Sequence, residues 1–199
     1  MHILVTAFEA FEGVPSNPTM RILADLPEQI GAVRLEKVVL PVDTRRAPEA
    51  LAPRWAAGPA AAVHLGVAAD RDRLSLEERA ENRLKFEVAD NRGAWLDDEP
   101  IEAGGPAFVD TRLPLEAIGE RLGRAGVAWE RSPSAGTFLC NQVMYASLRA
   151  LPRGTPTGFI HVPPDEILAA ELGRPCPQPL AEQTAGILTA LGLLVRIPN

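Results

Sequence analysis

The sequence has few residues of the kinds that mark disulfide-rich or metal-binding proteins. Its two cysteines, Cys140 and Cys176, are too few in 199 residues for a disulfide framework. The histidines, His2, His64 and His161, form no HExxH pattern and no paired Cys-His spacing. GxGxxG, Walker and GxSxG motifs are also absent. We therefore expect no metal site and no organic cofactor.

Positive charge is also scarce. Lys and Arg total 20 against 26 Asp and Glu, the formal net charge is -6 and the pI is about 5.2. The arginines are scattered among acidic residues and form no basic cluster. Proteins that neutralise nucleic-acid phosphates carry basic stripes instead. We expect no nucleic-acid partner and interpret these charges as a solvated surface.

Long hydrophobic runs are missing as well. No apolar segment approaches the roughly 18 residues of a membrane span. The first residues, MHILVTAFEAF, have no basic region and meet Glu9 almost at once, unlike a signal peptide. We expect no membrane association and, with so few cysteines, a reducing cytoplasmic location.

The remaining composition is that of a globular protein. Hydrophobic residues make up 46% and charged residues 23% of the chain, close to the average for folded domains. The length predicts a single domain over residues 1–199. The 19 prolines are about twice the usual share, and most of them fall in the predicted connections.

Strand-like and helix-like segments alternate along the chain. We expect strands at His2–Thr6, Arg34–Val42, Ala61–Leu65, Val127–Glu130 and Gly158–Val162. We expect helices from Pro18 (capped by Asn17) to about Ile30, and over Arg46–Trp55, Leu115–Gly126, Phe138–Leu151 and Leu180–Val195. Leu74–Gly93 has no clear pattern apart from a turn at Asp90–Gly93. The alternation predicts an α/β fold with a mostly parallel sheet.

This fold class predicts where a site forms. In open α/β sheets, sites lie beyond the carboxyl ends of the strands. The loops after Thr6, Leu65 and Val162 should therefore share one edge of the sheet.

The most distinctive local segment is Ser134–Tyr145, SAGTFLCNQVMY. A loop with Gly136 leads into a predicted helix, and Cys140 lies near its first turn. The unpaired N–H groups and dipole of a helix N-terminus stabilise a thiolate. The alternative is a small buried apolar residue, which is common for a free cysteine. Cys176 lies between prolines with no helix start, and we interpret it as incidental.

A nucleophilic thiolate needs a base and an orienting group. His161 ends an apolar strand just before two prolines, where its side chain could face the sheet edge. A hydrogen-bonded core histidine is the alternative, and His64 has a similar position. For the carboxylate, the run around Glu77, Glu78 and Glu81 offers candidates, although such a charge run usually marks a solvated helix face.

Together, these segments resemble the pyroglutamyl peptidase I family, the cysteine peptidases that remove an N-terminal pyroglutamyl residue. The matches are Ser134–Tyr145 around the family's nucleophile, Gly158–Pro163 (GFIHVP) around its histidine, and Leu74–Asn82 around its glutamate. The opening strand with Phe8, Phe11, Gly13 and Asn17-Pro18 resembles the family's Phe-containing loop. The order of the matches holds over essentially the whole chain.

The resemblance implies a three-layer α/β/α domain with a mixed, mostly parallel sheet, and a catalytic set of Cys140, His161 and Glu77. Counting back from Asn82 selects Glu77 rather than Glu78. The substrates implied are pyroglutamyl peptides. Phe8 and Phe11 would clamp the lactam ring, Phe138 would close it, and Val67 would offer a backbone carbonyl. A homo-oligomer, either tetramer or dimer, is also implied.

Both loops matched to the family's substrate loops have lost glycines. The family's glycines are replaced by Ala7, Glu12, Ala69 and Asp70. Because a Cβ resists positive φ, we expect these loops to be loosely ordered without ligand and to settle on binding. The altered loops also leave open a catalytically inert binding protein on the same fold. A nucleoside phosphorylase is a third hypothesis, but Gly66–Arg71 is a poor phosphate cradle.

Overall fold

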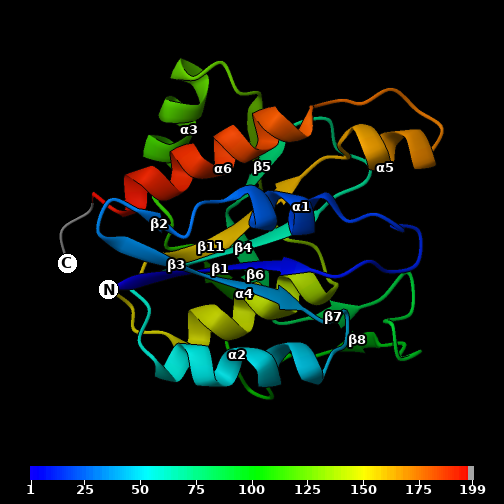
Figure 1. Ribbon diagram of the computed structural model, residues 1–199. Helices are drawn as coiled ribbons and strands as arrows, with labels where there is room; N and C mark the ends of the chain where they lie inside the picture. Colours follow the sequence, from blue (N-terminus) through cyan, green and yellow to red (C-terminus); the bar gives the residue numbers. More distant parts are fainter. Residues whose placement is uncertain (197–199) are drawn as a thin grey trace.

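The computed structural model describes residues 1–196, and the last three residues of the predicted domain, 197–199, lie outside the described residues. A seven-stranded sheet forms the middle of the molecule (Figure 1), with strand order β10-β5-β11-β4-β1-β3-β2. Its strands are β1 (His2–Phe8), β2 (Gln29–Ile30), β3 (Val33–Leu40), β4 (Ala61–Val67), β5 (Leu74–Glu77), β10 (Trp129–Ser132) and β11 (Thr157–Val162).

Helices cover both faces of this sheet (Figure 1), as the α/β prediction requires. One face carries α1 (Pro18–Asp25), α3 (Leu115–Arg124), α5 (Glu166–Glu171) and α6 (Leu180–Leu194). The other face carries α2 (Arg46–Ala56) and α4 (Leu139–Ala150). The three-layer arrangement with a mixed, mostly parallel sheet is confirmed.

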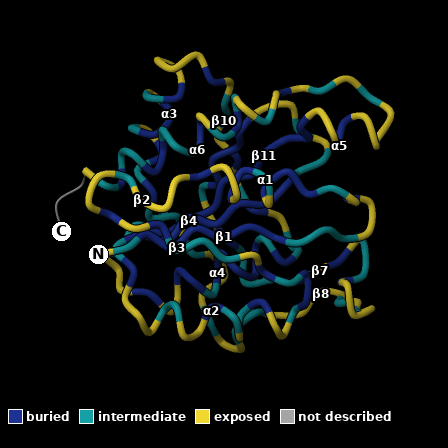
Figure 2. Tube along the Cα trace, in the orientation of Figure 1, coloured by how far each residue is buried: buried dark blue, intermediate teal, exposed yellow. Residues whose placement is uncertain are grey.

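Each layer interface has its own apolar core, because successive residues of a strand point to opposite faces. In β1, Ile3, Val5 and Ala7 belong to the core under α1, α3 and α6. Leu4 and Phe8 belong to the core under α2 and α4. Figure 2 shows the result: the central strands β1, β4 and β11 are largely buried, and most exposed residues lie along the outer helices, the loops and the edge strands.

The strands that carry the predicted site run parallel. β1 pairs in parallel with β3 and β4, and β11 pairs in parallel with β4. Their carboxyl ends therefore meet at one edge, which confirms the predicted juxtaposition of the loops after β1, β4 and β11. β5 is the exception, since it runs antiparallel to β11.

The segment between β5 and α3 was not resolved by the sequence pattern. It contains two small ladders, β6 (Arg79–Glu81) with β9 (Phe108–Asp110), and β7 (Leu84–Lys85) with β8 (Asp97–Glu99). The turn expected at Asp90–Gly93 is present, with the Gly93 N–H donating to the Asp90 carbonyl over 2.9 Å.

Three expectations about elements were wrong. The helix expected to reach Ile30 ends at Asp25, because Pro27 forces the preceding Leu26 into an extended conformation (ψ 142°). The charged run around Glu77 is strand rather than solvated helix, since β5 is buried between β10 and β11. The strand expected at Val127–Glu130 begins two residues later, and α5 went unrecognised.

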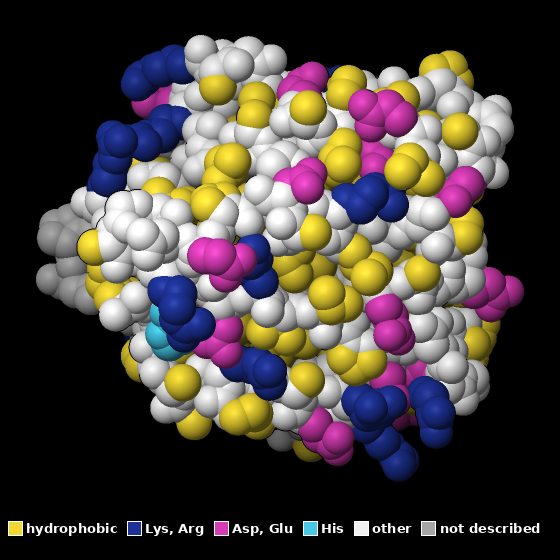
Figure 3. Space-filling view, in the orientation of Figure 1, with side chains coloured by type: hydrophobic (Ala, Val, Ile, Leu, Met, Phe, Trp, Pro, Cys, Tyr) yellow, Lys and Arg dark blue, Asp and Glu magenta, His cyan; other side chains and the backbone are white. Residues whose placement is uncertain are grey.

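The surface agrees with the scattered charges of the sequence. On the face seen in Figure 3, Lys and Arg side chains are interspersed with Asp and Glu rather than gathered into a stripe. Among the helices of residues 1–196, none combines the length and apolarity that crossing a membrane requires.

Candidate active site

Cys140 is the second residue of α4, at the carboxyl edge of the sheet. The residue before the helix, Phe138, is extended and makes no side-chain cap hydrogen bond. The first N–H groups of a helix have no intrahelical acceptor. Leu139 and Cys140, the first two residues of α4, both line the cavity described below, so their N–H groups are near enough to serve a ligand there.

Two features fix the start of α4. Gly136 adopts φ +81°, a left-handed conformation that other residues rarely adopt, and turns the loop toward the helix. Asn141 is fully buried and accepts from the Glu81 N–H over 2.7 Å. Its amide donates to the carbonyls of Glu81 and Arg83. Sequence reasoning missed Asn141. The one signal for it was an asparagine directly after the candidate nucleophile.

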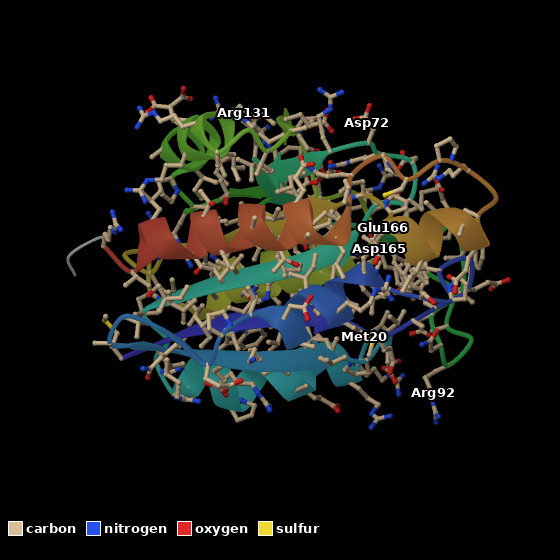
Figure 4. The ribbon with its side chains drawn as sticks, turned by 45° about the horizontal axis from the view of Figure 1, so that its top comes forward. Met20, Asp72, Arg92, Arg131, Asp165 and Glu166 are labelled. Carbon is tan, nitrogen blue, oxygen red and sulfur yellow. The ribbon has the colours of Figure 1, made fainter. Side chains whose placement is uncertain are left out.

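His161 lies near the end of β11, where its imidazole is 6% exposed. Burial alone would lower the pKa of His161. The charge and hydrogen bond of Cys140, followed by those of Glu77, raise the pKa of His161 to about 9. The contacts with Cys140 and Glu77 therefore favour the cationic form of the imidazole. After Pro163 and Pro164 comes Asp165, labelled at the start of α5 in Figure 4. It caps α5 and pairs with Arg21 of α1, which anchors the chain beyond His161.

Glu77 is the carboxylate next to His161. Its Oε1 lies 2.7 Å from His161 Nδ1, and the residue is fully buried. Burial would raise the pKa of Glu77, but His161, Ser132 and Arg71 lower it below its ordinary value. The neighbouring Glu78 instead pairs with Arg131. The count from Asn82 that selected Glu77 agrees with this geometry.

Gly66 provides the room for the thiol. A Cβ at this position would lie 2.8 Å from Cys140 Sγ and 2.8 Å from Cζ of Phe159. Real Cβ atoms do not approach other heavy atoms so closely, so any other residue would displace the Cys140 thiol or the Phe159 ring. The close approach of β4 to α4 therefore depends on glycine.

A cavity of about 150 Å³ opens beside Cys140 and His161. An apolar cavity of about this volume is large enough to bind benzene. Of the described residues that line it, none is Asp, Glu, Lys or Arg. The lining residues are Phe8, Phe11, Asn17, Val42, Gly66, Val67, Ala135, Gly136, Thr137, Phe138, Leu139, Cys140 and His161. Such a cavity suits a small uncharged ring.

The four residues expected to bind substrate all line this cavity: Phe8, Phe11, Val67 and Phe138. The ring of Phe138 lies 6.0 Å from that of Phe11. Phe86, which sequence reasoning missed, packs edge-on against Phe138 at 4.6 Å. Phe86 is 3% exposed and outside the lining, so it supports the wall of the cavity from behind.

The strain expected in the two loops is absent. Ala7 lies inside β1 and is fully buried, and among the described non-glycine residues only Asp98 has a positive φ. The replaced glycines are therefore not at positions that need glycine. Glu9 is anchored rather than repelled, since its Oε1 accepts from the Val42 N–H over 3.0 Å and from Asn91 over 2.9 Å. The premise for loose loops was wrong.

The other candidates lie apart from this site. His64 is a core residue bonded to Thr6, and burial lowers its pKa to about 3. Burial also raises the pKa of Cys176, whose nearest hydrogen-bond acceptor is the Pro164 carbonyl. Within residues 1–196, no cluster of His, Cys, Asp and Glu could hold a metal ion. Arg71 is engaged by Glu77, which leaves Gly66–Arg71 without a free cation for phosphate.

Comparison with known proteins gives a consistent result. The family model described as pyroglutamyl peptidase matches residues 1–194. A pyrrolidone-carboxylate peptidase of Pyrococcus furiosus is 40% identical over 175 residues, 84% of each chain. One of Halalkalibacterium halodurans is 37% identical, covering 85% of this chain and 87% of its own.

Solved structures agree with the sequence relatives. The crystal structure of pyrrolidone carboxyl peptidase from Thermus thermophilus superposes with a TM-score of 0.92 at 44% identity, covering 96% of this chain and 98% of that one. The enzyme from Pyrococcus furiosus gives a TM-score of 0.92 at 33% identity, with 98% of both chains covered. The fold, the order of the motifs and these relatives lead to one conclusion: the chain belongs to the pyroglutamyl peptidase family.

Proposed function

We propose that this protein is a cysteine exopeptidase that hydrolyses the amide bond after an N-terminal pyroglutamyl residue. The observation that carries the proposal is a small cavity, lined by no Asp, Glu, Lys or Arg among the described residues, beside the hydrogen-bonded set of Cys140, His161 and Glu77. The cavity supplies a slot for an uncharged lactam, and the three side chains supply a nucleophile, an acid–base group and its orienting carboxylate.

The first half of the reaction forms a thioester. The Cys140 thiolate attacks the pyroglutamyl carbonyl carbon, and the N–H groups at the start of α4 hold the developing oxyanion. As the C–N bond breaks, His161 gives its Nε2 proton to the leaving amine. Glu77 accepts from Nδ1 throughout, which keeps the imidazole in one orientation.

The second half releases pyroglutamate. His161, now neutral, takes a proton at Nε2 from a water molecule whose oxygen attacks the thioester carbon. The C–S bond then breaks, and its electron pair returns to Cys140 as the thiolate. This restores the thiolate and the imidazolium with which the cycle began.

Recognition of the ring follows from the cavity lining. The lactam carries no charge, so it needs no charged partner from the part of the cavity that would hold the ring, where the lining has no Asp, Glu, Lys or Arg. Phe11 and Phe138 bring two aromatic faces to the ring. Val67, at the end of β4, brings main chain to the cavity, and its carbonyl is our choice of acceptor for the ring N–H.

The experiment that tests the substrate compares three reporter amides that differ only in the N-terminal residue: pyroglutamyl, prolyl and glutamyl. We expect hydrolysis of the pyroglutamyl amide alone, because the prolyl and glutamyl residues carry charged amines and the cavity lining offers no Asp or Glu to pair with them. No hydrolysis of any of the three would favour the inert binding protein. Preference for the prolyl amide would contradict a lactam site.

We further propose that the chain acts as a single domain, assembled into a homodimer or homotetramer, in the cytoplasm. Both cysteines are free thiols, which suits a reactive thiolate in a reducing compartment. Sedimentation of the purified protein measures the assembly directly.

A further inference from the structure

Arg71, in the loop after β4, contacts the same carboxylate oxygen as the histidine of the proposed site. Its Nη1 lies 2.7 Å from Glu77 Oε1, and this Oε1 also lies 2.7 Å from His161 Nδ1. Glu77 is fully buried, whereas the Arg71 side chain is 23% exposed. One buried oxygen therefore has two cationic neighbours, and only one of them can lose its charge near neutral pH.

The groups around Glu77 come from three elements. His161 faces it from β11, Arg71 from the loop after β4, and the Ser132 hydroxyl from β10. Cys140 lies beyond His161. Among the ion pairs of residues 1–196, Arg71 is thus the one permanent cation on Glu77.

On the basis of the proposed function, we propose that Arg71 is a positioning residue for the hydrolysis of the thioester. After the amine leaves, His161 is neutral and Glu77 is ionised, so this buried pair carries one negative charge. Arg71 balances that charge. A buried negative pair without a counter-ion takes up a proton more readily.

That extra proton would stop the second half of the reaction. Whether the protonated pair is an imidazolium with a carboxylate or an imidazole with a carboxylic acid, Nε2 carries a proton. It then cannot accept one from water. The first half has the opposite need, because His161 must hold a proton to give to the amine. Arg71 therefore matters for deacylation and not for acylation.

The kinetic test compares wild type with Arg71→Met, which removes the charge, and Arg71→Lys, which keeps it. Arg73→Met is the matched control, because Arg73 is an exposed neighbour paired with Asp72 at the outer edge of the molecule (Figure 4). The substrate is the pyroglutamyl reporter amide. Wild-type hydrolysis of this amide reports on the proposed function separately.

For Arg71→Met we expect a burst of about one equivalent of amine, then a kcat lowered by about ten- to a hundredfold. KM should fall with kcat, leaving kcat/KM within about threefold of wild type, and the acid limb of kcat should move to higher pH. Arg71→Lys should restore most of kcat, and Arg73→Met should match wild type. A fall in kcat/KM without a burst would mean that Arg71 only supports the structure, and would overturn the proposal.

A second measurement does not depend on activity. In a Cys140→Ser background, the His161 imidazole is titrated by NMR with and without Arg71→Met. The pKa of His161 should rise by about one unit when Arg71 is replaced, and should not change with Arg73→Met. An unchanged His161 pKa in the folded Arg71→Met protein would overturn the proposed role of Arg71, whichever substrate the enzyme hydrolyses.

Discussion

The carboxylate of Glu77 and the imidazole of His161 meet at 2.7 Å although the residues are 84 positions apart. Glu77 ends β5 and His161 lies near the end of β11, and these neighbouring strands run antiparallel. In this antiparallel pairing, Ser75 lies opposite His161 and Leu76 opposite Ile160. The register brings the carboxylate of the next residue, Glu77, within hydrogen-bond distance of the His161 imidazole.

The first prediction concerns the carboxylate. Glu77→Gln should lower kcat/KM by about a hundredfold or more, within the range of about 10²–10⁴ for an acid–base group that loses its function. The reason is that an amide cannot balance the imidazolium charge. Glu78→Gln is the control, since Glu78 pairs with Arg131 outside the site. Steady-state kinetics on the pyroglutamyl amide test this prediction. A larger loss of kcat/KM in Glu78→Gln than in Glu77→Gln would refute Glu77 as the carboxylate of the site.

The second prediction concerns alkaline pH. His161 must be protonated to release the amine, and its pKa is raised to about 9. The kcat/KM should therefore fall as pH rises through about 9. Because the folded-state pKa lies above the ordinary value of 6.5, the stability that this contact contributes is complete below pH 6.5. It is lost as pH rises toward and through 9.

Thermal unfolding of the wild type and of the Cys140→Ala control between pH 6 and 10 tests this pH dependence of stability. Without Cys140, the largest contribution that raises the pKa of His161 is gone, so the alkaline loss of stability should be smaller and should end at a lower pH. Identical alkaline profiles for the two proteins would contradict a charge contact between Cys140 and His161.

The third prediction concerns acid and His64. The folded-state pKa of His64 is lowered to about 3 by burial. Its contribution to stability is therefore present above pH 6.5 and lost as pH falls toward 3. His64→Gln should weaken the acid dependence of the melting temperature and keep kcat at pH 7 within a few-fold. An unaltered acid profile, or a hundredfold loss of kcat, would count against a purely structural histidine.

The fourth prediction concerns the loop after β1. Glu9→Ala removes the carboxylate that accepts from the Val42 N–H and the Asn91 amide. The loop should then be held in its folded position less firmly, by about 1–1.5 kcal/mol of free energy. A tenfold change in binding corresponds to about 1.4 kcal/mol, so KM should rise by about five- to tenfold with kcat little changed. Glu12→Ala, at an exposed position, should change neither. Equal changes of KM in Glu9→Ala and Glu12→Ala would contradict the anchoring role of Glu9.

Much of the site was predictable because its residues lie in short motifs. The start of α4 could be located from the sequence around Cys140. The alternation of strands and helices predicted that the site lies at the carboxyl edge of the sheet. The resemblance to the family then related these segments to Glu77. Local pattern alone favoured a solvated helix face there, because a glutamate in a charged run gives no sign that two other strands will bury it.

What the sequence left out depends on contacts between distant residues. Asn141 hydrogen-bonds to a residue 60 positions away. Phe86 packs against Phe138, roughly 50 positions away. The premise of the loop hypothesis, backbone strain at the replaced glycines, was wrong for a related reason. Lost glycines suggested strain, but the backbone at Ala7 is ordinary strand, and Glu9 found partners on residues 42 and 91.

The most direct measurement is hydrolysis of the pyroglutamyl amide by wild type, Cys140→Ala and Cys176→Ser, with iodoacetamide labelling of the wild type mapped by mass spectrometry. We predict that Cys140→Ala folds and loses turnover, while Cys176→Ser keeps most of it. Labelling should reach Cys140 first, in step with the loss of activity, because a thiolate at a helix start reacts faster than a partly buried thiol. Turnover that survives in Cys140→Ala, or inactivation that follows labelling of Cys176, would contradict the account.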